Sequence, residues 1–232
     1  MEIDGIVFDK DGTLYDFNAT WSGWMLRLLH EVSGGDPVLV ETLAEVVSFD
    51  TDRCRFRKDS PVIAGTVDEV AALMAPFLDM GPAEMGEVLR ASGAKVEQLP
   101  VCDLPALMGD LRRNGYAIGI ATNDSEYPAR EHLERSAVLD LFDFVAGADS
   151  GFGAKPGPGQ LLAFCEQTGC APDACVMIGD SSHDMIAARQ AGMVCLGVLT
   201  GPAEYADLAP HCDDVIESIR DLPAWLEARK AG

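Results

Sequence analysis

Residues 6–14, Ile-Val-Phe-Asp-Lys-Asp-Gly-Thr-Leu, decide the fold of this chain. A mostly apolar run, 3–8, stops at Asp9 and Asp11, which is typical of a buried strand that ends in a turn. Side chains alternate along a strand, so Asp9 and Asp11 should lie on one side and Lys10 on the other. Two carboxylates about 6–7 Å apart repel each other, and a divalent cation bound between them is the simplest way to offset this repulsion. An ordinary surface turn is the alternative.

The composition indicates a folded, strongly acidic protein that is not suited to binding polyanions. The chain has 232 residues, of which 48% are hydrophobic, and a formal charge of −21. This charge argues against nucleic acid and anionic membranes as partners. It also requires locally placed cations if the substrate is an anion, so we expect a bound metal and a few positioned Lys or Arg residues.

No apolar run approaches the roughly 18 residues that a membrane helix needs, and the acidic start Met-Glu-Ile-Asp is not a signal peptide. We therefore expect a cytoplasmic protein. The seven cysteines form no Cys-x-x-Cys pair, and the four histidines make no ligand pair at helical spacing. A zinc enzyme is not expected.

The chain divides by pattern into a helical block and an alternating part. Residues 17–95 have helical periodicity without convincing strand alternation. After residue 96, helices alternate with apolar strands, which predicts βαβ units and a parallel sheet. The expected strands are 116–122, 142–146, 175–180, 193–199 and 214–216. We therefore predict an α/β core, residues 1–16 and 96–232, with an inserted all-helical domain, 17–95.

Three later stretches place polar residues next to expected strands or helix starts. In open α/β sheets, such residues converge at the carboxyl ends of the strands. Thr122 ends one expected strand and Asn123 follows it, and together they offer an anion site, with a helix N-cap as the alternative. Lys155, before Pro156, is a rigidly placed charge suited to a phosphate, or else a mobile surface lysine.

The third stretch is Ile178-Gly-Asp-Ser-Ser-His-Asp184. Asp180 follows a buried strand and is expected to bind a metal, with Asp184 in support. Helix capping competes with this interpretation, because acids at a helix N-terminus also stabilise its dipole. A serine hydrolase is not indicated, since Ser181 and His183 lie outside any Gly-x-Ser-x-Gly elbow.

Taken together, the four stretches resemble the motifs of the haloacid dehalogenase (HAD) superfamily of phosphatases, in the expected order. The resemblance covers residues 1–15 and about 96–232, and it is nearest to phosphoglycolate phosphatase-like members with a small helical cap. It implies a Rossmann-like parallel sheet with a cap inserted after the first motif.

The resemblance also implies a role for each motif residue. Asp9 would be the nucleophile that forms an aspartyl-phosphate, and Asp11 the general acid and base. Mg²⁺ would be held by Asp9, the backbone carbonyl of Asp11 and Asp180, with Asp184 in support. Thr122, Asn123 and Lys155 would bind the phosphoryl group. A carboxylate at position 11 favours phosphoryl transfer over dehalogenation, because a halide needs no acid to leave.

Lys10 departs from the commoner apolar residue of the motif, and we expect it to point away from Asp9. A second unusual feature is a basic segment with Arg53, Arg55, Arg57 and Lys58. One hypothesis is that Arg55 and Arg57 face the active site and bind a second anionic group of the substrate. The alternative is a solvated surface paired with neighbouring acids.

The function that these expectations support is a Mg²⁺-dependent phosphatase acting on a small phosphorylated metabolite, with phosphoglycolate as the first candidate. A phosphomutase of the same superfamily and a non-catalytic phosphate-binding regulator remain the alternatives.

Overall fold

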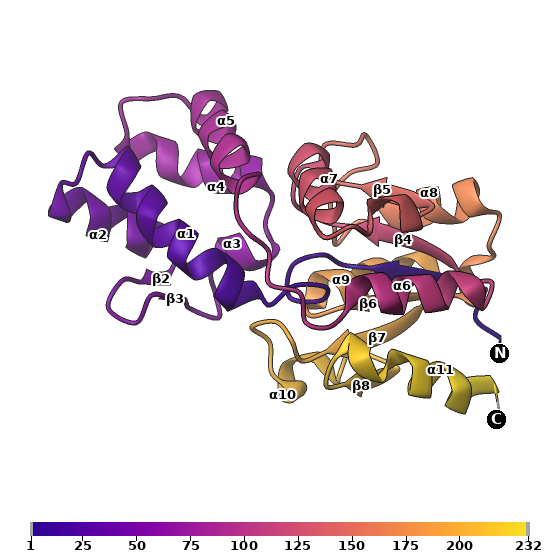
Figure 1. The fold of residues 1–232 in the computed structure, drawn as a ribbon. Coiled ribbons are helices and arrows are strands. Elements are labelled where there is room, and N and C mark those ends of the chain that lie inside the picture. Colours follow the sequence, from indigo (N-terminus) through magenta and orange to yellow (C-terminus); the bar gives the residue numbers. More distant parts are fainter. Residues whose placement is uncertain (1, 231–232) are drawn as a thin grey trace.

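The computed structural model describes residues 2–230, which form a sheet-based core and a helical unit at one end of it (Figure 1). All strand pairs in the core sheet are parallel, in the order β5-β4-β1-β6-β7-β8. The strands are β1 Gly5–Phe8, β4 Ala117–Ala121, β5 Phe144–Ala146, β6 Cys175–Gly179, β7 Val194–Val198 and β8 Asp214–Ile216. Each of the expected strands is present, one to two residues shorter at an end in most cases.

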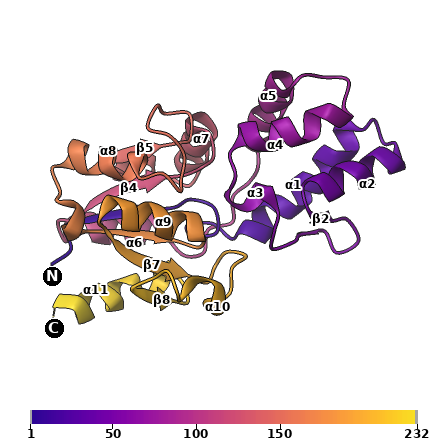
Figure 2. The same cartoon turned by 180° about the vertical axis from the view of Figure 1, so that it is seen from behind.

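Helices cover both faces of this sheet (Figures 1 and 2). They are α6 Leu104–Arg113, α7 Glu126–Arg135, α8 Gly159–Thr168, α9 Ser182–Ala191, α10 Tyr205–Leu208 and α11 Leu222–Lys230. Ile6 and Phe8 of β1 join the apolar cluster that includes α6 and α11, whereas Val7 joins the one that includes α8 and α9. Strand β1 is therefore buried on both sides, which explains its uninterrupted apolar sequence.

The position of β1 determines where the functional residues meet. Phe8 pairs with Ile120 of β4 on one side and with Ile178 of β6 on the other. The chain therefore reverses its direction of winding across the sheet at β1, and the carboxyl ends of three adjacent strands border one crevice.

The helical unit has a hydrophobic core of its own. Its helices are α1 Phe17–Val32, α2 Pro37–Val46, α3 Pro61–Ala64, α4 Val67–Met74 and α5 Pro82–Gly93. The buried members of its apolar cluster run from Phe17 to Val96, while the two clusters beside the sheet contain no residue between these two. This separation supports the proposed division into a core, 1–16 and 96–232, and a cap, 17–95.

The expected α/β sheet with a helical cap is confirmed, with two local differences. The cap also contains a short antiparallel pair, β2 Phe49–Asp50 and β3 Arg55–Phe56, which was not predicted. Helix α4 ends at Met74 because Pro76 has no N–H to continue it, and a 3₁₀ turn, Ala75–Phe77, interrupts the helical pattern there. None of the helices within residues 2–230 has the length and apolarity that crossing a bilayer demands.

The central position of β1 predicts a large cost for weakening it. Ile6 is fully buried, so Ile6→Ala should lower the free energy of unfolding by about 2–5 kcal/mol. Denaturant unfolding measures this, with Val38→Ala on the exposed surface of α2 as the control, expected within about 0.5 kcal/mol of wild type. Equal effects of the two substitutions would contradict the buried placement of β1.

Candidate active site

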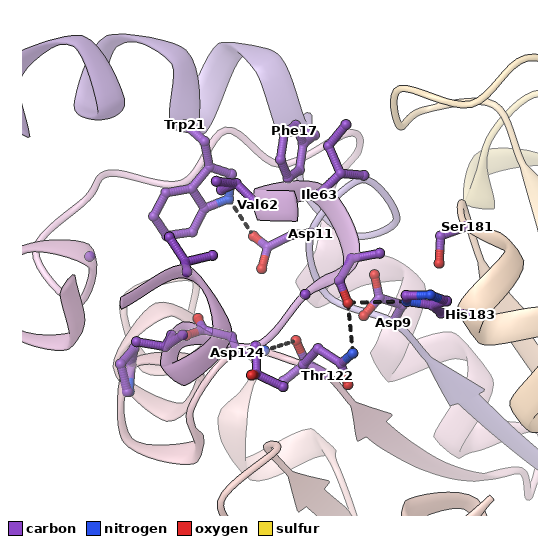
Figure 3. A pocket seen from close by; sticks show the side chains of 18 of the residues that line it. Asp9, Asp11, Phe17, Trp21, Val62, Ile63, Thr122, Asp124, Ser181 and His183 are labelled. Atoms are coloured by element: carbon purple, nitrogen blue, oxygen red, sulfur yellow. Dashed lines mark hydrogen bonds between the residues drawn. The ribbon is translucent and has the colours of Figure 1, made fainter. Parts of the chain in front are cut away.

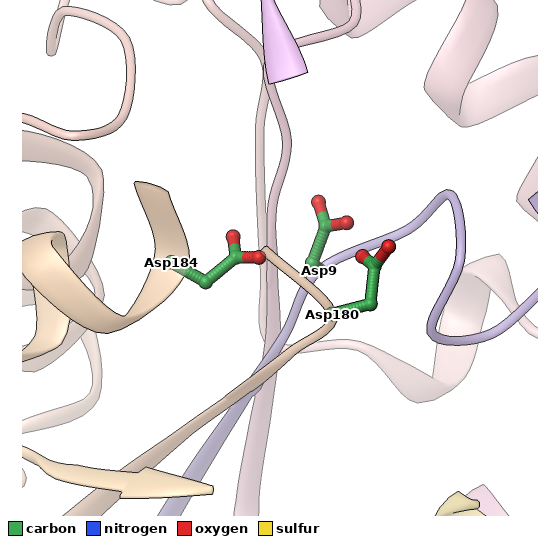
Figure 4. Close-up of side chains that lie close together, drawn as sticks. All are labelled: Asp9, Asp180 and Asp184. Atoms are coloured by element: carbon green, nitrogen blue, oxygen red, sulfur yellow. The ribbon is translucent and has the colours of Figure 1, made fainter. Parts of the chain in front are cut away.

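Three carboxylates meet at the crevice beside β1. Asp9 directly follows β1, Asp180 directly follows β6, and Asp184 lies in the first turn of α9. One oxygen of each lies within 4.8 Å of the others, and all three residues are buried (Figure 4). The parallel sheet thus brings together two residues that are 171 positions apart in sequence.

Lys155 supplies the positive charge nearest to these acids. Its Nζ lies 2.7 Å from Asp9 Oδ1 and 2.6 Å from Asp184 Oδ1, and the residue is only 5% exposed. Burial alone would lower the pKa of Lys155, but the carboxylates of Asp184 and Asp9 outweigh it and raise the pKa above its usual value. The alternative of a mobile surface lysine is wrong.

One lysine does not balance three buried acids. Burial raises the pKa of Asp9 to about 7, against the effect of Lys155 and with an added contribution from Asp184. Burial, followed by repulsion from Asp9 and Asp184, raises the pKa of Asp180 well above its usual value. The crevice therefore favours a further cation.

The donor atoms fit a hard divalent cation, since they are carboxylate oxygens held close together. The chain also makes room for Asp180: a Cβ atom on Gly12 or Gly201 would lie 2.3 Å or 1.6 Å from its Oδ2. Asp184 additionally accepts hydrogen bonds from the Ser181 N–H and hydroxyl at 3.0 and 2.8 Å, which form a capping box of α9. Capping and the supporting role therefore coexist in this residue.

Asp11 belongs to a second charged group. Lys10 is fully buried, and its Nζ lies 2.6 Å from Asp11 Oδ2 and 3.2 Å from Asp124 Oδ2. Asp11 Oδ1 accepts a hydrogen bond of 2.8 Å from Trp21 Nε1 of α1 (Figure 3). The cation beside the Asp11 carboxylate is thus Lys10, so the expected placement of Lys10 on the side opposite to Asp11 is wrong. The Lys10 ammonium pairs with Asp11 and Asp124, whereas Asp9 pairs with Lys155.

His132 of α7 links this second group to the cap. Its Nε2 lies 3.1 Å from the Gly93 carbonyl, and its Nδ1 lies 3.2 Å from Lys10 Nζ. Because a carbonyl only accepts and an ammonium only donates, Nε2 carries the proton and the ring is neutral. Burial, with the added charge of Lys10, lowers the pKa of His132 to about 3.

The two polar residues after β4 have different positions. Thr122 lines the cavity, and its Oγ1 accepts a hydrogen bond of 3.1 Å from the Asp124 N–H. The N-cap of α7 is Ser125, so capping does not explain Thr122. Asn123 Nδ2 donates to the carbonyls of Ala64 and Lys155, both at 2.8 Å, while its Oδ1 accepts from the Lys155 N–H. Asn123 therefore orients the lysine loop and contacts the cap.

A cavity of about 100 Å³, partly open to solvent, lies between the cap and these residues (Figure 3). The core side presents Asp9, Asp11, Thr122 and Lys155, whereas the cap side is mainly aliphatic and aromatic. An apolar wall that faces a few convergent polar groups is typical of a small-molecule site.

The basic segment does not reach this cavity. Arg57 forms an exposed ion pair with Glu45, and Arg53 lies 3.8 Å from Asp50. Arg55, in β3, borders a separate surface hollow, and none of these arginines lines the cavity. This arrangement favours the alternative of a solvated surface, and we do not assign substrate binding to Arg55 or Arg57.

Four residues of the site were not anticipated from the sequence: Trp21, Asp124, His132 and Gly201. Asp124 follows Thr122 and Asn123 directly, so its place at a strand end was a usable signal. Trp21 and His132 are hydrophobic-face positions of their helices, and nothing local distinguishes them from core residues.

The comparisons with known proteins agree with this geometry. The model of the haloacid dehalogenase-like hydrolase family matches residues 3–192. The chain belongs to this family. It is 38% identical to a phosphoglycolate phosphatase of Rhodospirillum rubrum, covering 95% of this chain and 90% of the relative. It is 33% identical to a phosphoglycolate phosphatase of Shigella boydii, with coverage of 95% and 91%. The resemblance found in the sequence is confirmed.

Solved structures of this family share the fold along nearly the whole chain. A predicted phosphoglycolate phosphatase from Haemophilus somnus superposes with a TM-score of 0.74 at 16% identity, over 97% of this chain and 98% of that one. A β-phosphoglucomutase from Clostridium difficile gives a TM-score of 0.65 at 19% identity, over 99% and 100%. At these identities the likeness concerns the fold alone.

The burial of Lys10 predicts a large effect of removing its charge. Lys10→Met leaves Asp11 and Asp124 without their shared cation, so the free energy of unfolding should fall by about 3–5 kcal/mol. Lys230→Met, which breaks an exposed pair with Glu227, is the matched control and should have a far smaller effect. Similar costs for both variants in denaturant unfolding would contradict this assignment.

The neutral His132 predicts a specific pH dependence of stability. The folded protein keeps His132 neutral, whereas the unfolded chain protonates it near pH 6.5, so acidification favours unfolding. From pH 7 to pH 5 this single group should remove about 2 kcal/mol. Between pH 7 and pH 5, the free energy of unfolding of His132→Gln should therefore fall by about 2 kcal/mol less than that of wild type. The control is His30→Gln, at an exposed position, which should show the same pH dependence as wild type. Identical pH profiles of wild type and His132→Gln would exclude the effect.

Proposed function

We propose that this protein is a Mg²⁺-dependent phosphatase that hydrolyses small phosphomonoesters through an aspartyl-phosphate. The observation that carries the proposal is the pair of charged groups at the end of β1. Asp9 lies among carboxylates with Lys155, while Asp11, two residues away, faces the same cavity from a separate group. The family and the names of its relatives support phosphoryl chemistry.

Asp9 acts as the nucleophile. Its Oδ1 is held by Lys155, which leaves Oδ2 to attack phosphorus in line with the ester bond. A bond forms between Asp9 and phosphorus while the bond to the leaving oxygen breaks. Lys155 neutralises charge on the phosphoryl oxygens as it develops, and the Thr122 hydroxyl donates a hydrogen bond to one of them.

Asp11 transfers the protons. It donates one to the leaving oxygen in the first step and removes one from the water that attacks the aspartyl-phosphate in the second. Release of inorganic phosphate then restores Asp9. Trp21 and Lys10 hold one oxygen each of the Asp11 carboxylate, and each oxygen keeps a second lone pair for the substrate or water.

The residues that would hold Mg²⁺ are Asp9, Asp180 and the backbone carbonyl of Asp11, with Asp184 in support through Lys155 and Ser181. When bound, the ion offsets the charge of the acids and of the phosphoryl group and polarises a phosphoryl oxygen. This role fits the raised pKa values of Asp9 and Asp180.

We further propose a cytoplasmic location and a small phosphorylated metabolite as the partner. The seven cysteines are all free, which suits a reducing compartment. The excess of acidic residues argues against nucleic acid and anionic membranes as partners.

The proposal predicts metal-dependent release of inorganic phosphate that requires Asp9. With 2-phosphoglycolate as the reference in a panel of phosphomonoesters, wild type should release phosphate with Mg²⁺ and lose this activity with a chelator. Asp9→Asn should reduce kcat by about 10⁴-fold or more, because no covalent intermediate forms. Titration calorimetry measures Mg²⁺ binding independently of activity.

The control is Asp173→Asn, the same change at an exposed position, which should behave as wild type. Phosphate release that persists in Asp9→Asn would refute the mechanism. Movement of the phosphoryl group within the substrate without release would indicate a phosphomutase, and Mg²⁺ and phosphate binding without any turnover would indicate a regulator.

A further inference from the structure

The cap side of the cavity carries no charge. Its lining residues come from α1, α3, α4, α5 and the loop before α4, and within residues 17–95 all of them are uncharged: Phe17, Trp21, Trp24, Val62, Ile63, Ala64, Gly65, Thr66, Val67, Val70, Leu89 and Gly93. Val62, Ile63 and Phe17 lie near Asp11 in the lining of the same cavity (Figure 3). The leaving group therefore meets an apolar wall.

The cations near the cavity are already paired. Lys155 is the only Lys or Arg that lines it within residues 2–230, and Asp9 and Asp184 hold its ammonium. Lys10 is buried behind Asp11 and Asp124. Lys58 borders a neighbouring groove and pairs there with Glu204 and Asp207. A carboxylate on the leaving group would thus enter the cavity without a partner.

Several backbone and neutral polar groups beside the cavity are already engaged within the protein. Helix α4 starts at the cavity, but its capping box occupies the Thr66 and Glu69 N–H groups, and its first turn carries Asp68 and Glu69. On the core side, Asn123 uses its amide on Ala64 and Lys155, and His183 Nδ1 donates to the Ala64 carbonyl. Burying a second anion here is unfavourable.

We propose that the cap selects phosphomonoesters with an uncharged, apolar leaving group and disfavours esters with a second anionic group. The inference rests on the proposed phosphatase function. Trp21 and Trp24 form an edge-to-face pair with centroids 5.1 Å apart, and the Trp21 N–H is used by Asp11, so the parts of the two rings that line the cavity offer apolar contact.

The test compares esters of primary alcohols: methyl, propyl, butyl and benzyl phosphate, with glycerol 3-phosphate and 2-phosphoglycolate. The value of kcat/KM should rise about fourfold for each added methylene. Benzyl phosphate should exceed 2-phosphoglycolate by about 100-fold or more. Preference for 2-phosphoglycolate would overturn the inference and leave the phosphatase function intact, whereas release from no ester would refute both.

A variant that adds a cation to the apolar cap side of the cavity tests whether these residues cause the substrate preference. Val62→Arg, or Ile63→Arg if the first does not fold, should raise the ratio of 2-phosphoglycolate to butyl phosphate turnover by about tenfold or more. Val38→Arg adds the same charge to the exposed surface of the cap and should leave the ratio unchanged. An unchanged ratio in the folded wall variants would show that the leaving group does not contact this wall.

Discussion

Two lysine side chains lie buried at the end of β1, and each keeps a different set of carboxylates together. Lys155 holds Asp9 and Asp184, whereas Lys10 holds Asp11 and Asp124. Without these cations, the mutual repulsion and desolvation of the acids would oppose the fold that brings them together. The pairing also divides two carboxylates that are two residues apart into chemically distinct environments, which a nucleophile and a proton donor require.

The second group depends on the cap as well as on the sheet. Trp21 of the cap donates to Asp11, and the Gly93 carbonyl of the cap fixes the His132 ring that contacts Lys10. The Ala64 carbonyl at the end of α3 accepts from both Asn123 and His183 (Figure 3). These hydrogen bonds fix the position of the cap relative to Asp9. The same part of the cap therefore orients Asp11 and lines the cavity.

The predictable part of the site follows from strand periodicity and parallel topology. Asp9, Thr122 and Asp180 each end an apolar run, and strands that share a sheet must bring such ends together. Side-chain partners across the domain boundary were not predictable, because Lys10, Trp21 and His132 meet only after the cap is placed. The basic segment shows the same limit: alternation placed Arg55 and Arg57 on one side, but Glu45 of α2, which pairs with Arg57, is brought there by tertiary packing.

The acidity of the chain gives the neutral cap wall a further consequence. A protein with a formal charge of −21 repels anionic ligands at long range, and each additional charge on a substrate increases that repulsion. The phosphoryl group is unavoidable and is met by Lys155 and the proposed metal. A second anion would add repulsion outside the cavity and an unpaired charge within it. An apolar leaving group adds neither cost and gains burial against Val62, Ile63 and Trp21, so the surface charge and the cavity lining favour the same class of ester.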